Sequence, residues 1–406
     1  MKCCWWGSTA SVWCWPGSGG DPPEPRLGYV PSHRGPPGAR LRPRSLLVTD
    51  LRLDIQPYTL ALRRPWRTAR GVLSARCGWL VRAASDDAVG FGDCAPLPVA
   101  GTETAARAVQ RLRYWCARAG EGSAGLLAAL EAELALGVAF APAADCALET
   151  ALLDLRARRD GVPLRRLLGP AALDRPAVNA MLGAAATLEH ATLQAALAAG
   201  FRVLKLKVGT APPAQELQRL QAVAARLPAG TTLRLDANGA WDAATAARVI
   251  EQLVGLPIDC LEEPLAIADD DALRCLQRVA PFSLAMDESL IGRMDSHLSR
   301  LPVRRLVLKP AAVGGLRRTC RLAERAAAAG REVVVTSLVE SAAGLWATAQ
   351  LAAAIGGELA HGLGTADWLA ADLGPPPPIV RGRAHLSDAA GSGFVPFADQ
   401  QPGPGA

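Results

Sequence analysis

Five charged residues stand at regular intervals along the second half of the chain, each at the end of a short apolar segment. They are Lys207, Asp236, Glu262, Asp287 and Lys309, spaced by 29, 26, 25 and 22 positions. Each interval fits one strand, one helix and their short loops. Three carboxylates and two lysines brought together in this way could combine a metal site with acid–base chemistry.

The three carboxylates predict a magnesium site. A hard divalent cation prefers oxygen ligands, and Mg²⁺ keeps some positions for water or substrate, so Asp236, Glu262 and Asp287 are sufficient as protein ligands. Mn²⁺ would fit the same set. Zinc is disfavoured because no His or Cys falls at a strand end beside them. His361, much farther along, is either a substrate contact or a hydrogen-bonded structural histidine.

The two lysines predict proton transfer. A lysine is a poor base near neutral pH unless its pKa falls, and several cations in one desolvated site would lower it. Lys207 and Lys309 are expected on opposite sides of a bound substrate, where one removes a proton and the other stabilises or reprotonates the product. The metal would neutralise charge that develops on a carboxylate oxygen. The expected reaction is proton abstraction α to a carboxylate.

These residues need a fold that brings successive strand ends to one point. From about Ala177 onward, Ala/Leu/Arg-rich helical stretches alternate with eight β-rich segments: AVNAMLG, RVLKLKVG, TLRLDA, IDCLEEP, FSLAMDE, RRLVLKP, EVVVTS and LAHGLG. Alternating units of this kind form a parallel sheet, and eight of them close into a barrel with catalytic groups at the carboxyl ends of the strands. A doubly wound open sheet is the alternative, but it would not bring all these strand ends together.

Strand periodicity places further polar residues beside the five. Because side chains alternate across a strand, Lys205 shares a side with Lys207, and Arg234 and Asn238 share a side with Asp236. Each residue alone would equally suit a solvated charge or an ordinary ion pair. Charges at five consecutive strand ends favour a common site in the barrel.

The domain organisation follows from these patterns. The fold class is α/β, a (β/α)8-type barrel over residues 173–370 preceded by a small α+β domain over residues 46–172. Residues 1–45, rich in Gly, Pro and Arg, are expected to be a disordered leader or the product of a mis-assigned start codon. Residues 371–406 are expected to form a C-terminal segment that ends in a disordered tail.

Composition excludes several classes of partner. The chain is 50% hydrophobic and 20% charged, with a net charge of +6 to which the arginines of the leader contribute. No dense Lys/Arg run interleaved with aromatic residues indicates nucleic-acid binding, and no run of about 18 apolar residues indicates a membrane span. Scattered cysteines without a CxxC pair favour buried thiols in a reducing, cytoplasmic compartment. We therefore expect a small-molecule carboxylate as the partner; no pattern indicates the oligomeric state.

The motifs LKLKVG, LRLDANGAW, LEEP, AMDES and VLKP, in this order, resemble the enolase superfamily in its muconate-lactonising branch. The resemblance covers about residues 46–395. It implies a modified TIM barrel, a capping domain over residues 46–172, and a C-terminal segment that packs back on that domain. It also implies lysine bases that work with Mg²⁺.

Within that branch, LVLKPAAVGGL, VVVTSLVESAAGL and HGLGTADWLAADL are most similar to the o-succinylbenzoate synthase family of menaquinone and phylloquinone biosynthesis. That family eliminates water from 2-succinyl-6-hydroxy-2,4-cyclohexadiene-1-carboxylate. By resemblance, Lys207 would abstract the α-proton and Lys309 would stabilise the enediolate from the opposite face. The implied substrate-binding residues are Lys205, Arg234 and Asn238 near the carboxylate, and Ser337 and Gly362 near the succinyl arm.

Two alternatives stay open. An N-acylamino acid racemase or dipeptide epimerase of the same superfamily also needs two lysines. Epimerases of this branch usually carry Asp-x-Asp on the eighth strand to hold the substrate's amino group, and HGLGT lacks an acidic pair. A catalytically inactive barrel that acts as a binding protein would be expected to have lost one of the five groups. Asp93 in GFGDCAPLP departs from the Glu that relatives usually carry.

Overall fold

The computed structural model describes residues 51–68, 71–136, 141–170, 172–294 and 297–397. The predicted leader over residues 1–45 and the predicted disordered tail beyond residue 397 lie outside these ranges. Everything described below belongs to the unit Val48–Ala406.

The N-terminal part is an antiparallel sheet followed by helices. The sheet has the order β1-β2-β3, with β1 Arg52–Thr68, β2 Gly71–Ser85 and β3 Ala88–Cys94. The helices are α1 Ala105–Ala117, α2 Gly122–Leu136, α3 Pro142–Arg159 and α4 Leu164–Leu168. Nearly every position of α3 is buried, since β3 and α11 both contribute to the apolar cluster around it.

Two glycines allow β3 to lie directly against α3. A Cβ atom at Gly92 would stand 2.0 Å from the carbonyl oxygen of Ala147, and one at Gly90 would stand 2.2 Å from that of Ala151. Both contacts are with helix backbone, which cannot rotate away as a side chain can. The glycines of the VGFGDC segment are therefore required by packing.

Replacing Gly92 with Ala is expected to lower the free energy of unfolding by about 3 kcal/mol, because the added methyl group must push β3 and α3 apart. Urea unfolding followed by circular dichroism measures this change. Gly120→Ala is the matched control, since a Cβ atom there has no atom within 4 Å. Equal midpoints for the two variants would contradict the packing argument.

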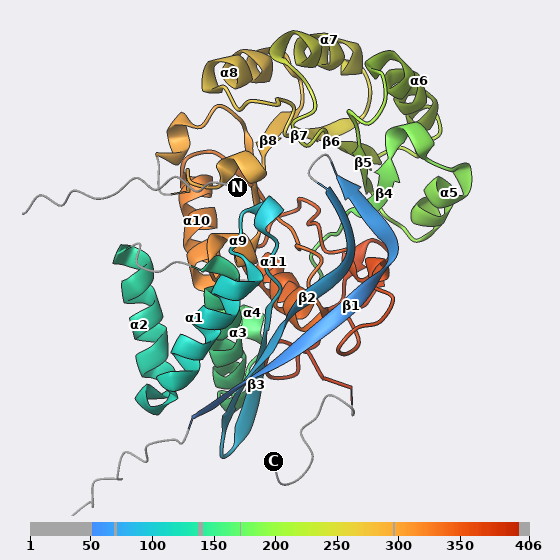
Figure 1. The fold of residues 1–406 in the computed structure, drawn as a ribbon. Helices are drawn as coiled ribbons and strands as arrows, with labels where there is room; N and C mark the ends of the chain where they lie inside the picture. The colour runs from blue at the N-terminus through green and yellow to red at the C-terminus, as the bar shows by residue number, and fades with distance from the viewer. Residues whose placement is uncertain (1–50, 69–70, 137–140, 171, 295–296, 398–406) are drawn as a thin grey trace, which may run out of the picture. The chain divides into compact units, whose positions relative to one another are not determined.

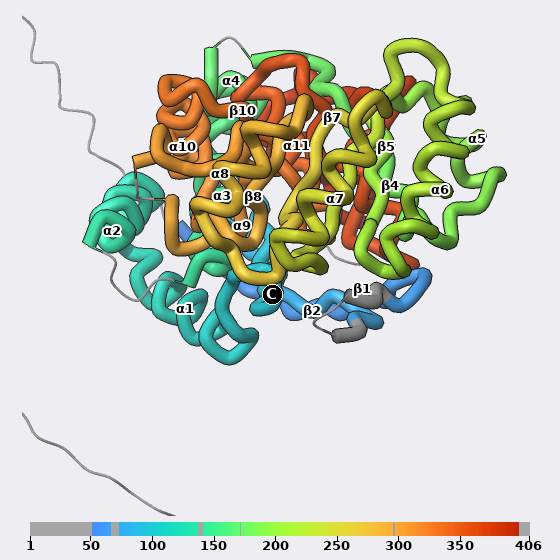
Figure 2. The backbone as a smooth tube through the Cα atoms, turned by 90° about the horizontal axis from the view of Figure 1, so that it is seen from above, coloured from blue at the N-terminus to red at the C-terminus, as the bar shows by residue number. Residues whose placement is uncertain are grey.

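The second part is a parallel sheet of seven strands in the order β4 to β10. The strands are β4 Ala180–Ala184, β5 Val203–Lys207, β6 Thr232–Asp236, β7 Ile258–Glu262, β8 Ser283–Met286, β9 Arg305–Leu308 and β10 Glu332–Val335. The helices are α5 His190–Ala198, α6 Pro213–Ala224, α7 Ala243–Leu253, α8 Asp270–Val279, α9 Pro310–Val313, α10 Leu316–Ala328 and α11 Ala342–Ile355. Helices α5 to α8 lie along the outside of β4 to β8 (Figure 1). Figure 2 shows α5, α6 and α7 in the same succession from above.

The eighth predicted strand, LAHGLG, forms only two isolated bridges. Val178 bridges His361 and Thr336 bridges Gly362, so the segment joins the β4 side of the sheet to its β10 side and closes the barrel. The imidazole Nδ1 of His361 accepts a hydrogen bond from the backbone N–H of Val335 at 3.0 Å. This side-chain contact takes a donor that a regular strand would have used, which explains why closure occurs without a full ladder.

The C-terminal segment returns to the N-terminal part. The backbone N–H of Ser392 donates to Asp154 on α3 at 2.5 Å, and Arg158 donates to the carbonyl oxygen of Phe394 at 2.9 Å. The rings of Phe394 and Phe91 meet edge to face at 5.4 Å between centroids. Its two short strands, β11 Ile379–Val380 and β12 Arg383–Ala384, pair with each other, and Arg383 also forms an isolated bridge with Ala177, just before β4.

Two negative findings complete the fold. No helix among the described residues is long and apolar enough to cross a membrane. The seven described cysteines are free thiols. The expectation that they are buried is wrong for Cys77 and Cys275, which are exposed.

Asp93 joins the N-terminal sheet to the barrel. Its carboxylate accepts hydrogen bonds from the backbone N–H and the hydroxyl of Ser341, both at 2.7 Å, at the start of α11. It also accepts one from the hydroxyl of Tyr58 at 2.5 Å. Burial raises the pKa of Asp93 to about 6, although these hydrogen bonds oppose the shift. The shorter acid at this position thus still reaches across to the barrel.

The raised pKa predicts a pH-dependent contribution to stability. The folded protein holds the Asp93 proton more tightly than the unfolded chain, so this contribution is present below about pH 4 and is lost as the pH rises through about 6. Asp93→Asn keeps a neutral group there. Relative to that variant, the free energy of unfolding of the native chain is expected to fall by at most about 3 kcal/mol between pH 4 and pH 7. Urea unfolding at four pH values measures the difference; a difference that does not change with pH would contradict the shift.

Candidate active site

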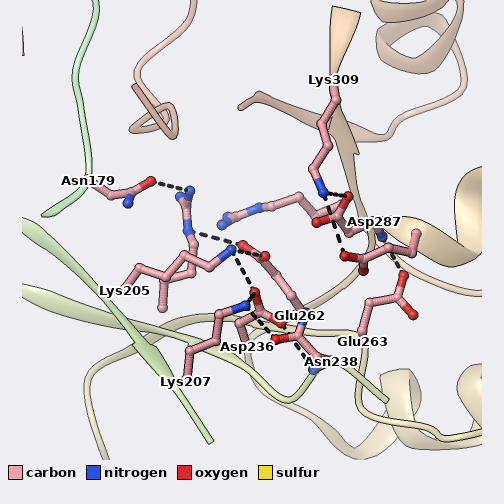
Figure 3. Close-up of polar contacts among 12 residues, drawn as sticks. Asn179, Lys205, Lys207, Asp236, Asn238, Glu262, Glu263, Asp287 and Lys309 are labelled. Atoms are coloured by element: carbon pink, nitrogen blue, oxygen red, sulfur yellow. Dashed lines mark hydrogen bonds and ion pairs between the residues drawn. The ribbon is translucent and has the colours of Figure 1, made fainter. Parts of the chain in front are cut away.

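Alternation along the strands separates the apolar core from the site. Leu206 stands between Lys205 and Lys207, and Leu235 stands between Arg234 and Asp236. Both leucines are fully buried in the cluster that also contains the apolar faces of the outer helices. The intervening polar side chains therefore point to the other side of the sheet, where Figure 3 shows their ammonium and carboxylate groups gathered together.

Lys205 bridges two of the predicted metal ligands. Its Nζ lies 2.9 Å from Asp236 Oδ2 and also pairs with Glu262 Oε2. Asp236 and Glu262 end the adjacent strands β6 and β7, whose register places these two residues opposite each other. Both carboxylates are buried, with side chains 3% and 1% exposed. The structure thus brings these two predicted ligands together around one cation.

Lys207, the predicted base, lies at the edge of the same cluster. Its Nζ is 2.7 Å from Asp236 Oδ2 and contacts Asn238 Oδ1. Its side chain is 22% exposed, more than Lys205 or Lys309. Asn238 adopts the left-handed backbone conformation, with φ of 45°, which turns its amide back toward the lysine. Lys207 is therefore held by two acceptors and open on one side.

Lys309 and Asp287 form a second pair. The Nζ of Lys309 lies 2.6 Å from Asp287 Oδ1 and 3.7 Å from Glu288 Oε1. Lys309 follows β9 and Lys207 ends β5, so three strands of the barrel separate them. This placement agrees with two lysines that approach a substrate from different sides.

Sequence reasoning missed Glu263, which orients Asp287. Glu263 Oε1 accepts hydrogen bonds from the backbone N–H of Asp287 at 2.5 Å, and from the N–H and hydroxyl of Ser289 at 2.9 and 2.7 Å. Its own backbone is left-handed, with φ of 45°. The signal was available as the second Glu of LEEP, a charged residue one step beyond a strand end.

Burial and the neighbouring carboxylates act in opposite directions on the pKa values of two lysines in the cluster. Burial tends to lower the pKa of Lys205 and of Lys309, but the facing carboxylates raise both above their usual range. Burial raises the pKa of Asp287, and Glu288 and Glu262 add to that rise while Lys309 opposes it. Asp236 is also buried, but Lys205 and Lys207 hold its pKa below the usual range. The described residues thus crowd negative charge around Asp287.

Arg234, a predicted substrate contact, lies inside the barrel. Its guanidinium donates to Asp259 at 2.8 Å and to Asn179 at 3.2 Å, and it stands 4.0 Å from Glu262. Asp259 is the extra residue at a register shift between β6 and β7. With Arg234 only 1% exposed, these contacts support Glu262 from within the barrel; contact with a substrate stays a prediction.

Ser337 and Gly362, predicted for the succinyl end, are neighbours. The backbone N–H of Ser337 donates to the carbonyl oxygen of Gly362 at 3.0 Å, and its hydroxyl bonds to that of Thr365 at 2.6 Å. His361 between the strands is buried, which together with Arg234 lowers its pKa to about 3. Its contact with Val335 favours the structural interpretation of this histidine.

The three predicted metal ligands fit a divalent cation by the type of their donor atoms. No three His, Cys, Asp or Glu side chains within the described ranges converge closely enough to ligate one ion. Lysine ammonium groups instead contact the three carboxylates: Lys205 at Asp236 and Glu262, and Lys309 at Asp287. All three acids are buried oxygen donors, and two already share one cation, which is the donor chemistry that Mg²⁺ requires.

Comparison with known families now identifies the chain. Residues 188–400 match the family described as enolase C-terminal domain-like. Residues 53–169 match the N-terminal domain of mandelate racemase and muconate lactonizing enzyme. The chain belongs to the enolase superfamily. The predicted fold class, a modified barrel with an N-terminal capping domain, is confirmed.

Relatives in the superfamily carry different activities. A hydrophobic dipeptide epimerase of Roseobacter litoralis is 30% identical over 74% of this chain and 88% of its own length. An o-succinylbenzoate synthase of Desulfotalea psychrophila is 27% identical over 78% of this chain and 94% of its own. The structure of a muconate lactonizing enzyme from Pseudomonas fluorescens, complexed with muconolactone, has a TM-score of 0.77 at 24% identity and covers 87% of this chain and 98% of its own. Similarity alone does not select one substrate among these.

Proposed function

We propose that this enolase-superfamily chain is an o-succinylbenzoate synthase, which removes water from 2-succinyl-6-hydroxy-2,4-cyclohexadiene-1-carboxylate. The observation that carries the proposal is the absence of an acid for a substrate amino group in the described segment that closes the barrel. From 360 to 366 this segment contains no acid. Ser337 and Gly362 meet there with neutral hydrogen-bonding groups.

The two acids that follow are both used elsewhere or turned away. Asp372 accepts hydrogen bonds from the backbone N–H of Ala342, at the start of α11, and from that of Leu373, both at 2.7 Å. Asp367 lies in a short 3-10 turn, Ala366–Trp368, and is exposed. An α-ammonium group would therefore lack a carboxylate partner, whereas a succinyl arm needs none. This supports a substrate without a free ammonium group and argues against a dipeptide epimerase.

The lysines supply the proton chemistry. Lys207 would take the proton from the carbon that bears the carboxylate, the electron pair would move into the ring, and the neighbouring C–O bond would break. The proton returns from Lys207 to the departing hydroxyl group, which leaves as water. Lys309 would stabilise the negative charge of the enediolate from the other side. Because the ring becomes aromatic, the elimination runs downhill and one lysine can act as base and then as acid.

Asp236, Glu262 and Asp287 would hold Mg²⁺, with Mn²⁺ as a substitute. When bound, the ion would neutralise these carboxylates and withdraw charge from the substrate carboxylate as its α-proton leaves. Glu263 keeps Asp287 in place through the backbone N–H of that residue. The Nε of Arg234 lies 4.0 Å from Oε1 of Glu262 within the barrel.

A second candidate is an N-acylamino acid racemase or dipeptide epimerase. It is favoured by the pair Lys207 and Lys309, which come from different sides of the barrel as a 1,1-proton transfer requires. The 30% identical epimerase relative also supports it. An inactive barrel that only binds ligands is disfavoured because all five charged groups are present.

The test is incubation of the full chain with the cyclohexadiene substrate and Mg²⁺ while the aromatic product is followed by absorbance. In parallel, an N-succinyl amino acid is incubated in D₂O and its α-deuterium content is measured. Formation of the aromatic product supports the synthase. Rapid deuterium exchange without dehydration would assign the racemase instead. The absence of both reactions would favour a binding protein.

A further inference from the structure

An open pocket of about 600 Å³ lies away from the active site and is rich in arginine. Its cationic residues, which together define the arginine pocket, are Arg274, Arg278, Arg300, Arg304 and Arg331. The synthase proposal uses none of them. A volume of this size matches sites that take small molecules.

The arginine pocket lies at the amino ends of the strands. Arg278 stands in the last turn of α8, before β8, and Arg304 immediately precedes β9. Arg331 immediately precedes β10. The lysines and carboxylates of the active site stand at the carboxyl ends of strands of the same sheet, with Asp287 after β8 and Lys309 after β9, so the strand lengths separate the two sites. Figure 1 shows α8 on the outer side of β8. Binding in this pocket would therefore not occupy the catalytic cavity.

Positive charge in the pocket is largely uncompensated. Arg274 pairs with Asp271 at 2.6 Å, and that carboxylate is almost fully exposed. Among the residues that the structure describes, the other four arginines have no carboxylate within 4 Å. Among the described residues, five cations face one exposed anion, which leaves a strong positive field in a concave site, where low-dielectric walls concentrate it.

Backbone carbonyls explain the placement of two of the arginines but do not neutralise them. Arg304 donates to the carbonyl oxygen of Ala280 at 2.7 Å, just after α8. Arg331 donates to Val303 at 2.9 Å and to Ser299 at 2.6 Å. These contacts hold the guanidinium groups in fixed positions, as capping of carbonyl groups does elsewhere. A pre-positioned cation binds an anion at a lower entropic cost than a mobile one.

Hydrogen bonds to backbone carbonyls do not explain the positions of the remaining arginines. Arg278 is exposed, and its described partner is the thiol of Cys275 at 3.1 Å. Arg300 is exposed and contributes a backbone carbonyl, which accepts from Arg274 at 3.3 Å. Neither guanidinium group has a described carboxylate or carbonyl partner, so both are available to a ligand in the pocket. Two fixed and two available cations on one concavity point to a multivalent anion.

We propose that the arginine pocket binds a small anion that carries two or more phosphoryl groups. The planar guanidinium fork matches phosphoryl oxygens in a bidentate manner. The uncompensated charge of about four fits a ligand such as a diphosphate better than a single carboxylate. The proposal is independent of the synthase assignment, because the pocket shares no residue with the active site.

The experiment is isothermal titration of the full chain with pyrophosphate at low ionic strength, with citrate as a carboxylate of similar charge. Arg300→Glu is expected to weaken pyrophosphate binding at least about tenfold, since one charge-assisted contact becomes repulsive. Arg278→Glu should act similarly, and Arg300→Lys should weaken binding less than Arg300→Glu, because lysine keeps the charge but not the bidentate fork. Arg226→Glu is the matched control: it is an exposed barrel arginine outside the pocket and carries the same charge change.

The outcomes separate a built site from general attraction. Tighter binding of pyrophosphate than of citrate, lost in Arg300→Glu and kept in Arg226→Glu, supports the proposal. No binding by the native chain would overturn it, as would equal weakening by Arg226→Glu or preference for citrate. Circular dichroism melting of each variant confirms folding, and Arg300→Glu should leave the turnover of the native chain unchanged.

Discussion

Lys207→Ala should lower dehydration of the cyclohexadiene substrate by about 10²- to 10⁴-fold, because general base catalysis by a positioned group contributes this much. The Lys207 Nζ is the ammonium group held by both Asp236 and Asn238, and its side chain is the most exposed of the three lysines in the site. Removal leaves Lys205 in contact with Asp236 and Glu262, so the carboxylates keep a cation. Steady-state assays with purified variant and native chains measure the loss.

Two further measurements define what that loss means. The Mg²⁺-dependent rise in melting temperature should be the same in Lys207→Ala as in the native chain, which shows that the metal site survives. Lys309→Ala should reduce turnover through lost charge stabilisation but leave proton removal from the substrate possible. Dehydration by Lys207→Ala within tenfold of the native rate would rule out Lys207 as the base.

Withdrawal of Mg²⁺ by chelation should lower turnover by about 10³-fold or more, since a divalent ion contributes several kcal/mol of charge stabilisation. Added Mg²⁺ or Mn²⁺ should restore it. Glu262→Gln should require much more Mg²⁺ for half-maximal activity, because one of three buried carboxylates is lost. The native chain should melt at a higher temperature with Mg²⁺, and Glu262→Gln should show a smaller rise.

Glu251→Gln is the matched control for this substitution. Glu251 is an exposed residue of α7, remote from the carboxylate cluster. Glu251→Gln should leave both the Mg²⁺ requirement and the melting response as they are in the native chain. Full activity of the native chain in excess chelator would contradict the assignment of Asp236, Glu262 and Asp287 as metal ligands.

Local pattern was sufficient for most of the barrel. Seven of the eight predicted β-rich segments form strands, since each combines an apolar run with short loops and a following helix. The exception is the segment around His361, where glycines and a side-chain hydrogen bond replace a regular ladder. That replacement depends on Val335, which lies 26 positions earlier, and no local pattern reports such a contact.

Residue types and their order were enough to predict which residues could do chemistry and which side of their strands they occupy. The alternation of Leu206 with Lys205 and Lys207, and of Leu235 with Asp236, leaves the charged side chains one direction once the leucines are buried. Strand spacing also determined that these charges end successive strands. Both inferences rest on interactions within a few residues.

How those side chains pair depends on the folding of distant strands against one another. Lys205 bridges Asp236 and Glu262, and Glu263 bonds the backbone of Asp287, because closure of the barrel brings separate strands within hydrogen-bond distance. The same closure gathers the arginine pocket from α8 and from the segments before β9 and β10. Pairing, burial and the resulting pKa shifts depend on distances between segments far apart in the chain, which residue order does not contain.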